Sequence, residues 1–252
     1  MLPGRLFAHY EVIARLGEGG MGTVYAARDL RLERKVALKV LAAREDVSFE
    51  DKETFKQRLR REAQHAAQLN SPNIVAVFDV GEVDDEVYVA FEYVEGRTLR
   101  ALLRDPDFVA EQRLATVVDV ARALAYAHDQ KVIHRDIKPE NVMVRPDGHV
   151  KTLYFRIARR ARSEDDHPPE PRHRGEHLGA FATPYTPGTS PTEDGQRVAG
   201  TPNYMAPEQI QGRPPSGAGD QFSWGVLAWE LLAGARPFRD ARDLIDALQI
   251  TK

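Results

Sequence analysis

The stretch "HRDIKPEN", residues 134–141, decides the fold and most of the chemistry that the sequence predicts. It lies between a long amphipathic segment and the short apolar run "VMV", so we expect a loop that follows a helix and precedes a strand. Asp136 can accept a hydroxyl proton or orient a nucleophile, Lys138 can neutralise a transferring phosphoryl group, and Asn141 offers an oxygen to Mg²⁺. A surface loop of mixed charge is the plain alternative, and the whole string makes it the weaker one.

Composition limits the classes of protein that remain. The chain has 252 residues and a formal net charge of −3, so no overall basic field points to nucleic acid or to an acidic membrane. It contains no cysteine, which excludes disulfides and thiolate sites and suits a reducing cytosol. The longest apolar run, residues 222–235, is too short to span a bilayer and contains Glu230, and the first residues lack a leader pattern. We expect a soluble, cytoplasmic protein with no nucleic-acid partner and no membrane segment.

The first part of the chain is rich in short β-branched segments. Such segments predict strands, which we expect at residues 10–17, 23–29, 35–41, 73–80 and 86–93. One helix is expected at residues 51–69, where apolar residues recur at three- and four-residue steps: Phe55, Leu59, Ala66 and Leu69. Glu62 falls on the same stripe, and a carboxylate on a buried face needs a partner.

After Gly96 the pattern becomes helical. Residues 111–130 are amphipathic, and residues 219–235 are apolar nearly all round, which predicts a helix buried in a core. Between them, residues 163–198 are rich in proline, glycine and charged side chains. This segment cannot bury enough apolar surface to fold alone, so we expect a long mobile loop.

The glycines of "GEGGMGTVY" form the first phosphate-binding candidate. Gly17, Gly19 and Gly22 have the G-x-G-x-x-G spacing, and glycine lets backbone amides approach phosphate oxygens closely. The pattern alone is weak, because ordinary glycine turns and dinucleotide-binding folds share it. Here the glycines lead into a second strand rather than a helix, which favours a hairpin lid over phosphates.

Lys39 in "VALKV" is a candidate phosphate ligand. Strand alternation turns it to the face opposite Leu38 and Val40. A solvated lysine on a strand is the plain alternative. Because Glu62 needs a partner, we predict an ion pair between Lys39 and Glu62 that aims the ammonium at a bound polyphosphate.

Four motifs stand in a family's order: "GEGGMGTVY", "VALKV", "HRDIKPEN" and "GTPNYMAPEQ". Residues 10–238 therefore resemble a bacterial Hanks-type Ser/Thr protein kinase domain. The resemblance implies an α+β, bilobal fold, with a β-rich N-lobe over residues 1–95 and a mainly helical C-lobe over residues 96–252. It also implies ATP with Mg²⁺ or Mn²⁺ as cofactors, and protein hydroxyl groups as acceptors, including those of the chain itself.

The same resemblance assigns roles to individual residues. It makes Asp136, Lys138, Lys39 and Glu62 catalytic, and it makes Asn141 a metal ligand. Asp220 is expected to brace the catalytic loop from the apolar helix. The nucleotide is expected to contact the three glycines and Lys39, with adenine between Val24, Ala37 and Met143 and against the main chain of Glu92 to Val94, beside the gatekeeper Phe91.

The stretch "YFR", residues 154–156, departs from the family pattern. Similar kinases carry "DFG" there, so Tyr154 replaces the aspartate that holds metal, and its neutral phenol is a poor Mg²⁺ ligand. Loss of a metal contribution of about 3 to 5 kcal/mol lowers the rate by about two to four powers of ten. Arg156 in place of glycine is expected to impair switching of the loop, although its guanidinium can also contact phosphate.

The segment from Tyr154 to Glu208 is longer than its counterpart in similar kinases. Hydroxyl groups in it are candidate phosphoacceptors, and a phosphothreonine there can pair with Arg135 and order the segment; a solvated linker is the alternative. The candidate acceptors are Thr183, Thr186, Thr189, Ser190 and Thr192. Metal binding by His167, His173 and His177 is the weaker interpretation of three histidines without cysteine.

The C-terminal end is a further departure. Similar domains continue beyond residue 238 with helices that cover the apolar helix, whereas this chain ends at Lys252. An apolar helix with one flank uncovered leaves an exposed patch, so we expect a truncated C-lobe that needs a partner there. Three functions stay open: a Ser/Thr kinase of reduced metal use, a pseudokinase that binds nucleotide or partners, and an inactive truncated fragment.

Overall fold

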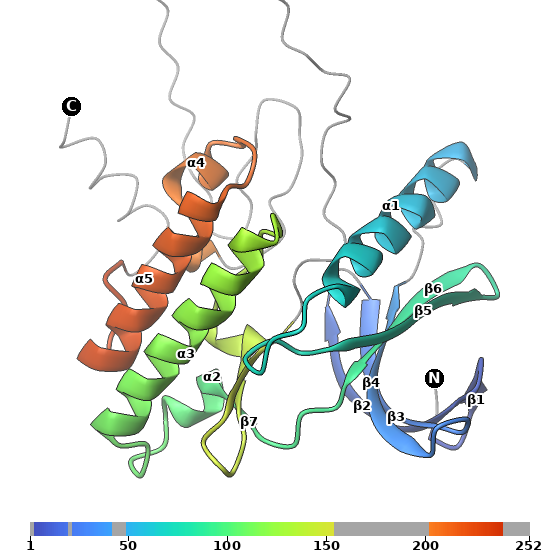
Figure 1. The fold of residues 1–252 in the computed structure, drawn as a ribbon, viewed down its shortest axis with the longest axis horizontal. Coiled ribbons are helices and arrows are strands. Elements are labelled where there is room, and N and C mark those ends of the chain that lie inside the picture. The colour runs from blue at the N-terminus through green and yellow to red at the C-terminus, as the bar shows by residue number, and fades with distance from the viewer. Residues whose placement is uncertain (1–2, 20–21, 42–48, 154–201, 239–252) are drawn as a thin grey trace, which may run out of the picture. The chain divides into compact units, whose positions relative to one another are not determined.

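The computed structural model describes residues 3–19, 22–41, 49–153 and 202–238 (Figure 1). Several predictions fall on residues outside these ranges. They concern the proline-rich loop at residues 163–198, the candidate phosphoacceptors and histidines within it, and the stretch at residues 154–156.

The first part of the chain forms a six-stranded antiparallel sheet in the order β1-β2-β3-β4-β6-β5. Its strands are β1 (Leu6–Phe7), β2 (Tyr10–Gly19), β3 (Gly22–Asp29), β4 (Arg34–Leu41), β5 (Val77–Val83) and β6 (Glu86–Glu92). Four of these strands, β2, β3, β4 and β6, lie where the β-branched segments predict them. Helix α1 (Phe49–Ala67) stands beside the sheet, close to the predicted 51–69.

The two faces of this sheet bury different side chains. Ala37 and Leu41 on β4 share a hydrophobic cluster with Leu59 of α1, whereas Leu38 and Val40 belong to a second cluster behind the sheet. Period-two alternation of β4 produces this division. Lys39 therefore lies on the face of β4 that packs against α1, opposite Leu38 and Val40, as the sequence predicts.

The strand predicted at residues 73–80 begins later than expected. Residues 73–75 leave the six-stranded sheet and pair instead with β9 (Val150–Thr152), through a parallel bridge between Ile74 and Thr152. The Val75 amide donates to the Thr152 carbonyl at 3.0 Å, and the Thr152 amide donates to the Asn73 carbonyl at 2.8 Å. The apolar run thus serves two different ladders, which a propensity pattern does not separate.

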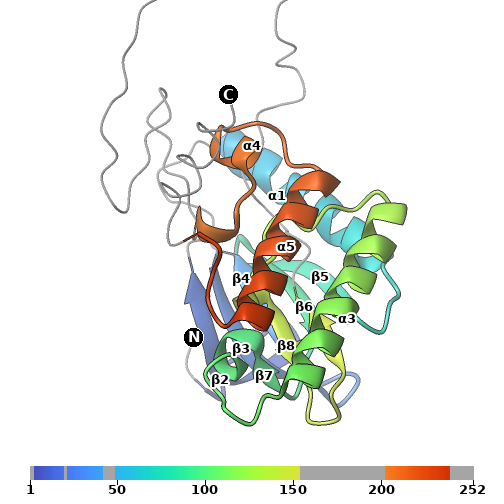
Figure 2. The ribbon, with the colours of Figure 1, turned by 90° about the vertical axis from the view of Figure 1, so that its left-hand side faces the viewer.

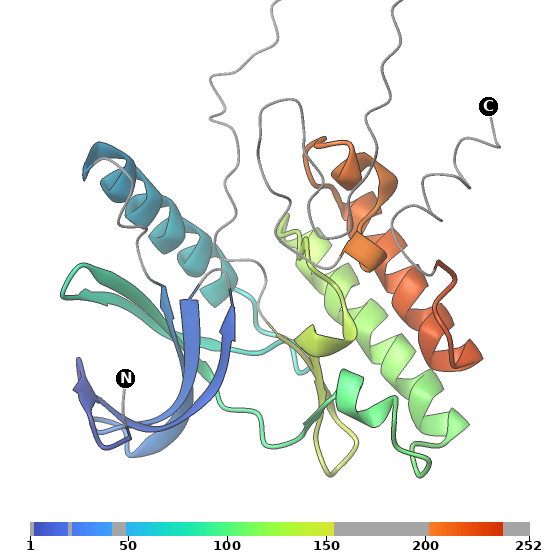
Figure 3. The same ribbon diagram turned by 180° about the vertical axis from the view of Figure 1, so that it is seen from behind.

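The rest of the described chain is mainly helical. Its helices are α2 (Leu99–Leu102), α3 (Ala110–Asp129), α4 (Pro207–Ile210) and α5 (Gly217–Ala233), with 3₁₀ turns at Pro139–Asn141 and Pro202–Tyr204. A small sheet, ordered β7-β8-β9, adds β7 (Arg97–Thr98) and β8 (Val142–Val144). Helices α3 and α5 run side by side in Figure 2 and in Figure 3, and the Trp224 indole donates to the Val117 carbonyl at 3.0 Å between them.

Helix α5 is buried on one face only, which corrects the prediction of burial all round. Val226, Leu227 and Leu231 are 4% exposed or less, but Trp229 and Leu232 are 57% and 56% exposed. Helix α3 covers only the buried side, and an apolar sequence does not reveal how many neighbours a helix has. The exposed pair matches the predicted apolar patch on this helix. No helix in the described ranges combines the length and the apolar character needed to cross a membrane.

Candidate active site

The loop that contains "HRDIKPEN" is held from below by Asp220 in the first turn of α5. Its Oδ2 accepts the His134 amide at 2.7 Å, and its Oδ1 accepts the Arg135 amide at 2.7 Å. The same Oδ2 lies 2.9 Å from Nε2 of His128 on α3. Asp220 is 1% exposed, and Arg135 has a φ of 70°, a left-handed conformation that needs external support. The carboxylate supplies that support, as the sequence-based expectation for Asp220 requires.

Asp136, Lys138 and Asn141 come together on this loop. Lys138 Nζ lies 2.9 Å from Asp136 Oδ2, and the Asn141 amide donates to the same Oδ2 at 2.9 Å and to the Asp136 carbonyl at 2.8 Å. The Asp136 and Lys138 side chains are 31% and 19% exposed, so both reach solvent. Two donors on one oxygen fix the carboxylate, and its other oxygen is the better placed to accept a proton from a hydroxyl group. Asn141 keeps its amide oxygen as an acceptor for a cation.

His134 is fully buried beneath the loop. The Asp136 amide donates to His134 Nδ1 at 3.2 Å, so Nε2 carries the proton and donates to the Leu153 carbonyl at 2.8 Å. Burial lowers the pKa of His134, because a charged imidazolium loses its hydration there. The neutral ring therefore links the catalytic loop to the residue that directly precedes Tyr154.

The protein is expected to become less stable as the pH falls below about 6.5, the ordinary pKa of histidine. Folded His134 stays neutral while the unfolded chain takes up a proton at this position. Unfolding therefore binds a proton, and the free energy of unfolding decreases as the pH decreases. Urea unfolding between about pH 7.5 and pH 5 measures this slope, with His134→Phe as the reference that cannot titrate there. Equal slopes in the two proteins would contradict the assignment.

Hydrophobic side chains cluster where the nucleotide is predicted. Ala37 and Phe91 are buried in one cluster, and Val24 and Met143 are partly buried against it. Val24 and Lys39 are register partners on β3 and β4. The structure thus gathers the side chains predicted to sandwich adenine beside the predicted phosphate ligand.

The glycine hairpin adjoins this wall. Gly17 pairs with Val24 and Gly19 with Gly22, so the three glycines end β2 and begin β3. Gly22 has a φ of 125°, and a Cβ there would lie 2.1 Å from the Val40 carbonyl oxygen, so only glycine fits. At Gly17 a Cβ would meet nothing within 4 Å, which leaves room for a ligand against the backbone. The residues present therefore fit a nucleotide polyphosphate.

The segment predicted to bind adenine through its main chain is held on two sides, which sequence reasoning missed. Lys151 of β9 pairs with Glu92 Oε2 at 2.8 Å and donates to the Ile74 carbonyl at 3.3 Å. The next residue, Tyr93, has the Lys35 ammonium 3.9 Å above its ring. Opposite charges 59 positions apart leave no periodic signal in a sequence, so no pattern reveals this pair.

Glu62 of α1 faces the catalytic loop. Its carboxylate lies 3.9 Å from the Arg135 guanidinium, and its side chain is 20% exposed rather than fully buried. The contact places Glu62 of α1 next to the catalytic loop. The ion pair between Lys39 and Glu62 stays a prediction.

Few candidate metal ligands lie among the residues that the structure describes. No cluster of three histidine, cysteine, aspartate or glutamate side chains suited to a metal occurs among the residues that the structure describes. Asn141 is the predicted ligand whose geometry is visible, and Tyr154 lies outside those ranges.

Comparisons with known proteins identify the family of the chain. The protein kinase domain profile matches residues 10–252. The chain is 38% identical to the serine/threonine-protein kinase PknB of Mycobacterium leprae, over 94% of this chain and 34% of that protein. It is 39% identical to a probable serine/threonine-protein kinase of Streptomyces coelicolor, over 94% of this chain and 32% of that protein. The chain spans about a third of the length of these relatives.

Solved structures give the same result. The PknI kinase domain of Mycobacterium tuberculosis matches with a TM-score of 0.67 and 29% identity, over 96% of this chain and 79% of that one. The chain therefore belongs to the protein kinase family and resembles its bacterial Hanks-type Ser/Thr members, and its fold is the α+β protein kinase fold.

Proposed function

We propose that this chain is an ATP-dependent Ser/Thr phosphotransferase domain whose rate is limited by its incomplete metal site. The observation that supports activity most directly is the joined set of Asp136, Lys138 and Asn141 on a loop braced by Asp220. The left-handed conformation of Arg135 costs free energy, and two hydrogen bonds to the buried Asp220 maintain it. Such a strained loop is typical of a functional site.

Nucleotide binding uses the groups gathered on the first sheet. Val24, Ala37 and Met143 enclose the adenine, and the main chain from Glu92 to Val94 donates and accepts hydrogen bonds at its edge. Backbone amides of the glycine hairpin and the ammonium of Lys39 contact the phosphates. When bound, ATP with Mg²⁺ or Mn²⁺ supplies an activated phosphoryl group and neutralises part of its charge.

Phosphoryl transfer uses the catalytic loop. Asp136 orients the acceptor hydroxyl and takes its proton as the new oxygen–phosphorus bond forms and the bond to the leaving phosphate oxygen breaks. The Lys138 ammonium lies 2.9 Å from Asp136, which places it beside the acceptor hydroxyl. From there it offsets the negative charge on the transferring phosphoryl group. Glu62 positions Lys39 through the predicted ion pair.

The acceptors that we propose are serine and threonine hydroxyls of proteins, including those of the chain's own segment after Tyr154. We also assign residues 1–95 to an N-lobe and residues 96–252 to a C-lobe, and we place the protein in the cytoplasm. A partner that covers Trp229 and Leu232 would remove the exposed apolar area on α5 from water.

Incorporation of labelled phosphate from ATP tests this function, with Mg²⁺ and separately with Mn²⁺, into the chain and into a basic protein substrate. Asp136→Asn is expected to lower incorporation by about 10² to 10⁴, because it removes the proton acceptor and keeps the shape. The matched control is Asp129→Asn, an exposed aspartate of α3. Equal incorporation in the natural chain and in Asp136→Asn would contradict the proposal, and nucleotide binding without incorporation would favour a pseudokinase.

A further inference from the structure

Lys56 on α1 is buried, which is unusual for a lysine. Its side chain is 4% exposed, and no other lysine in the described ranges is classed as buried. A buried ammonium loses its hydration, so it is tolerated only where anions replace water. The position therefore has a specific set of partners.

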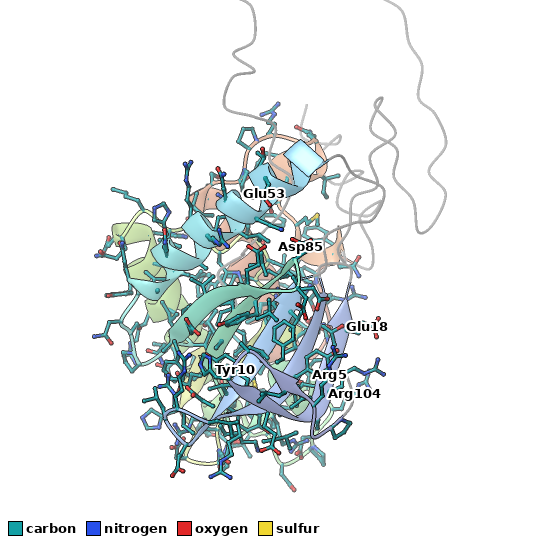
Figure 4. All side chains as sticks on the ribbon, turned by 90° about the vertical axis from the view of Figure 1, so that its right-hand side faces the viewer. Arg5, Tyr10, Glu18, Glu53, Asp85 and Arg104 are labelled. Carbon is teal, nitrogen blue, oxygen red and sulfur yellow. The ribbon has the colours of Figure 1, made fainter. Side chains whose placement is uncertain are left out.

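Three carboxylates surround the Lys56 ammonium. Nζ lies 2.8 Å from Glu82, 2.9 Å from Asp85 and 3.1 Å from Glu53. Glu53 is one turn earlier on α1, whereas Glu82 and Asp85 belong to the β5–β6 hairpin. Figure 4 labels Glu53 on the helix and Asp85 at the tip of the hairpin, the two ends of this cluster. The hydrogen bonds to Glu82 and Asp85 raise the pKa of Lys56 above its ordinary value, so it stays charged.

The partners are not equivalent. The Glu82 carboxylate is 25% exposed and also binds the Arg60 guanidinium, one turn further along α1. The Asp85 carboxylate is 89% exposed, so water screens its attraction. Lys56, Arg60 and Glu82 are therefore the core of the contact between the helix and the hairpin.

The hairpin offers a rigid base for this contact. Asp84 and Asp85 have φ values of 49° and 66°, the left-handed pair of a two-residue hairpin turn. Strand β6 continues from this turn between β5 and β4, and it pairs with β4 from Val36 to Leu41. A helix fixed to the hairpin is thus fixed relative to the strand that carries Lys39.

The same helix carries Glu62, about 9 Å further along its axis than Lys56 at 1.5 Å per residue. Leu59 and Ala63 dock the middle of α1 on the sheet through apolar contacts, which permit rolling and sliding. Directional ionic contacts at Lys56 restrict those motions, because each carboxylate has a fixed place.

We propose that Lys56 is a positioning residue of the phosphotransfer site, which locks α1 to the β5–β6 hairpin and thereby sets Glu62 relative to Lys39. This inference rests on the proposed function, because it acts on the nucleotide site described there. The lock couples the outer edge of the sheet to phosphate binding.

The test measures the dissociation constant of a fluorescent N-methylanthraniloyl ADP with Mg²⁺ together with the thermal midpoint. Lys56→Met, which keeps a long unbranched side chain and removes the charge, is expected to weaken binding by about tenfold. Lys56→Arg is expected to restore most of the affinity, because a guanidinium reaches the same carboxylates. Arg61→Met, an exposed cation of the same helix, is the matched control and is expected to bind like the natural chain.

Amide hydrogen exchange of α1 is the second measurement, and faster exchange in Lys56→Met is expected. Unchanged affinity in a folded Lys56→Met, beside a natural chain that binds, would overturn the positioning role. A natural chain that binds no nucleotide refutes the proposed function instead, and unchanged exchange of α1 would then refute the lock as well. Should Lys56→Met not fold, Glu82→Gln removes the shortest contact and carries the same comparison.

Discussion

Replacing Tyr154 with aspartate and Arg156 with glycine is expected to raise phosphate incorporation by about 10² to 10⁴. Aspartate supplies a carboxylate oxygen, the ligand that Mg²⁺ prefers, where the phenol of tyrosine offers a weak neutral one. Glycine at position 156 restores the backbone freedom that allows the loop of a "DFG" segment to switch conformation. Asn141 is the second ligand. Its NH₂ group donates to Asp136, which leaves its amide oxygen to bind the metal.

Initial rates at saturating ATP measure this effect, with Mg²⁺ titrated in both proteins. The repaired chain is expected to reach half of its maximal rate at lower Mg²⁺, since a carboxylate adds a charged ligand. Asp136→Asn placed in the repaired chain is the control and is expected to remove the gain. A repaired chain that is no faster than the natural one would show that Tyr154 does not limit the reaction.

The catalytic loop was predictable because its chemistry resides in residue types at fixed short spacings. Asp136, Lys138 and Asn141 lie within six residues, so a single turn of chain brings them together. The strands were predictable for a similar reason, because short runs of β-branched and apolar residues mark them locally, as in β4, which buries side chains on both faces. Local patterns suffice where neighbours in sequence are neighbours in space.

Long-range pairs were not predictable from these patterns. Glu230 appears in the sequence only as a charge within an apolar run, yet Arg100 of α2 lies 2.9 Å from it and the Tyr204 hydroxyl donates to it. The Lys56 cluster and the pair between Lys151 and Glu92 likewise join segments that are distant in sequence. Burial of a charged residue depends on which elements meet, and a single sequence does not state that.

Asp220→Ala is expected to destabilise the protein by about 3 to 5 kcal/mol and to abolish phosphate transfer. The carboxylate is 1% exposed and accepts two backbone amides at 2.7 Å, so its removal leaves the amides of His134 and Arg135 without their acceptor. Loss of an acidic side chain from the first turn of α5 accounts for only about 0.3 to 1 kcal/mol of this, so most of the loss comes from the catalytic loop. Urea unfolding gives the free energy, and labelled ATP gives the activity.

Graded variants separate bracing from simple loss of packing. Asp220→Asn keeps the shape and one acceptor oxygen but turns an NH₂ group toward a backbone donor, so we expect a stability loss of roughly half that of Asp220→Ala. Asp129→Ala, an exposed aspartate at the end of α3, is expected to change stability by less than about 0.5 kcal/mol. If Asp220→Asn were as stable as the natural chain, the two amides would not depend on the charge of the carboxylate. The left-handed Arg135 would then need another source of support, and the link from α5 to Asp136 would lose its physical basis.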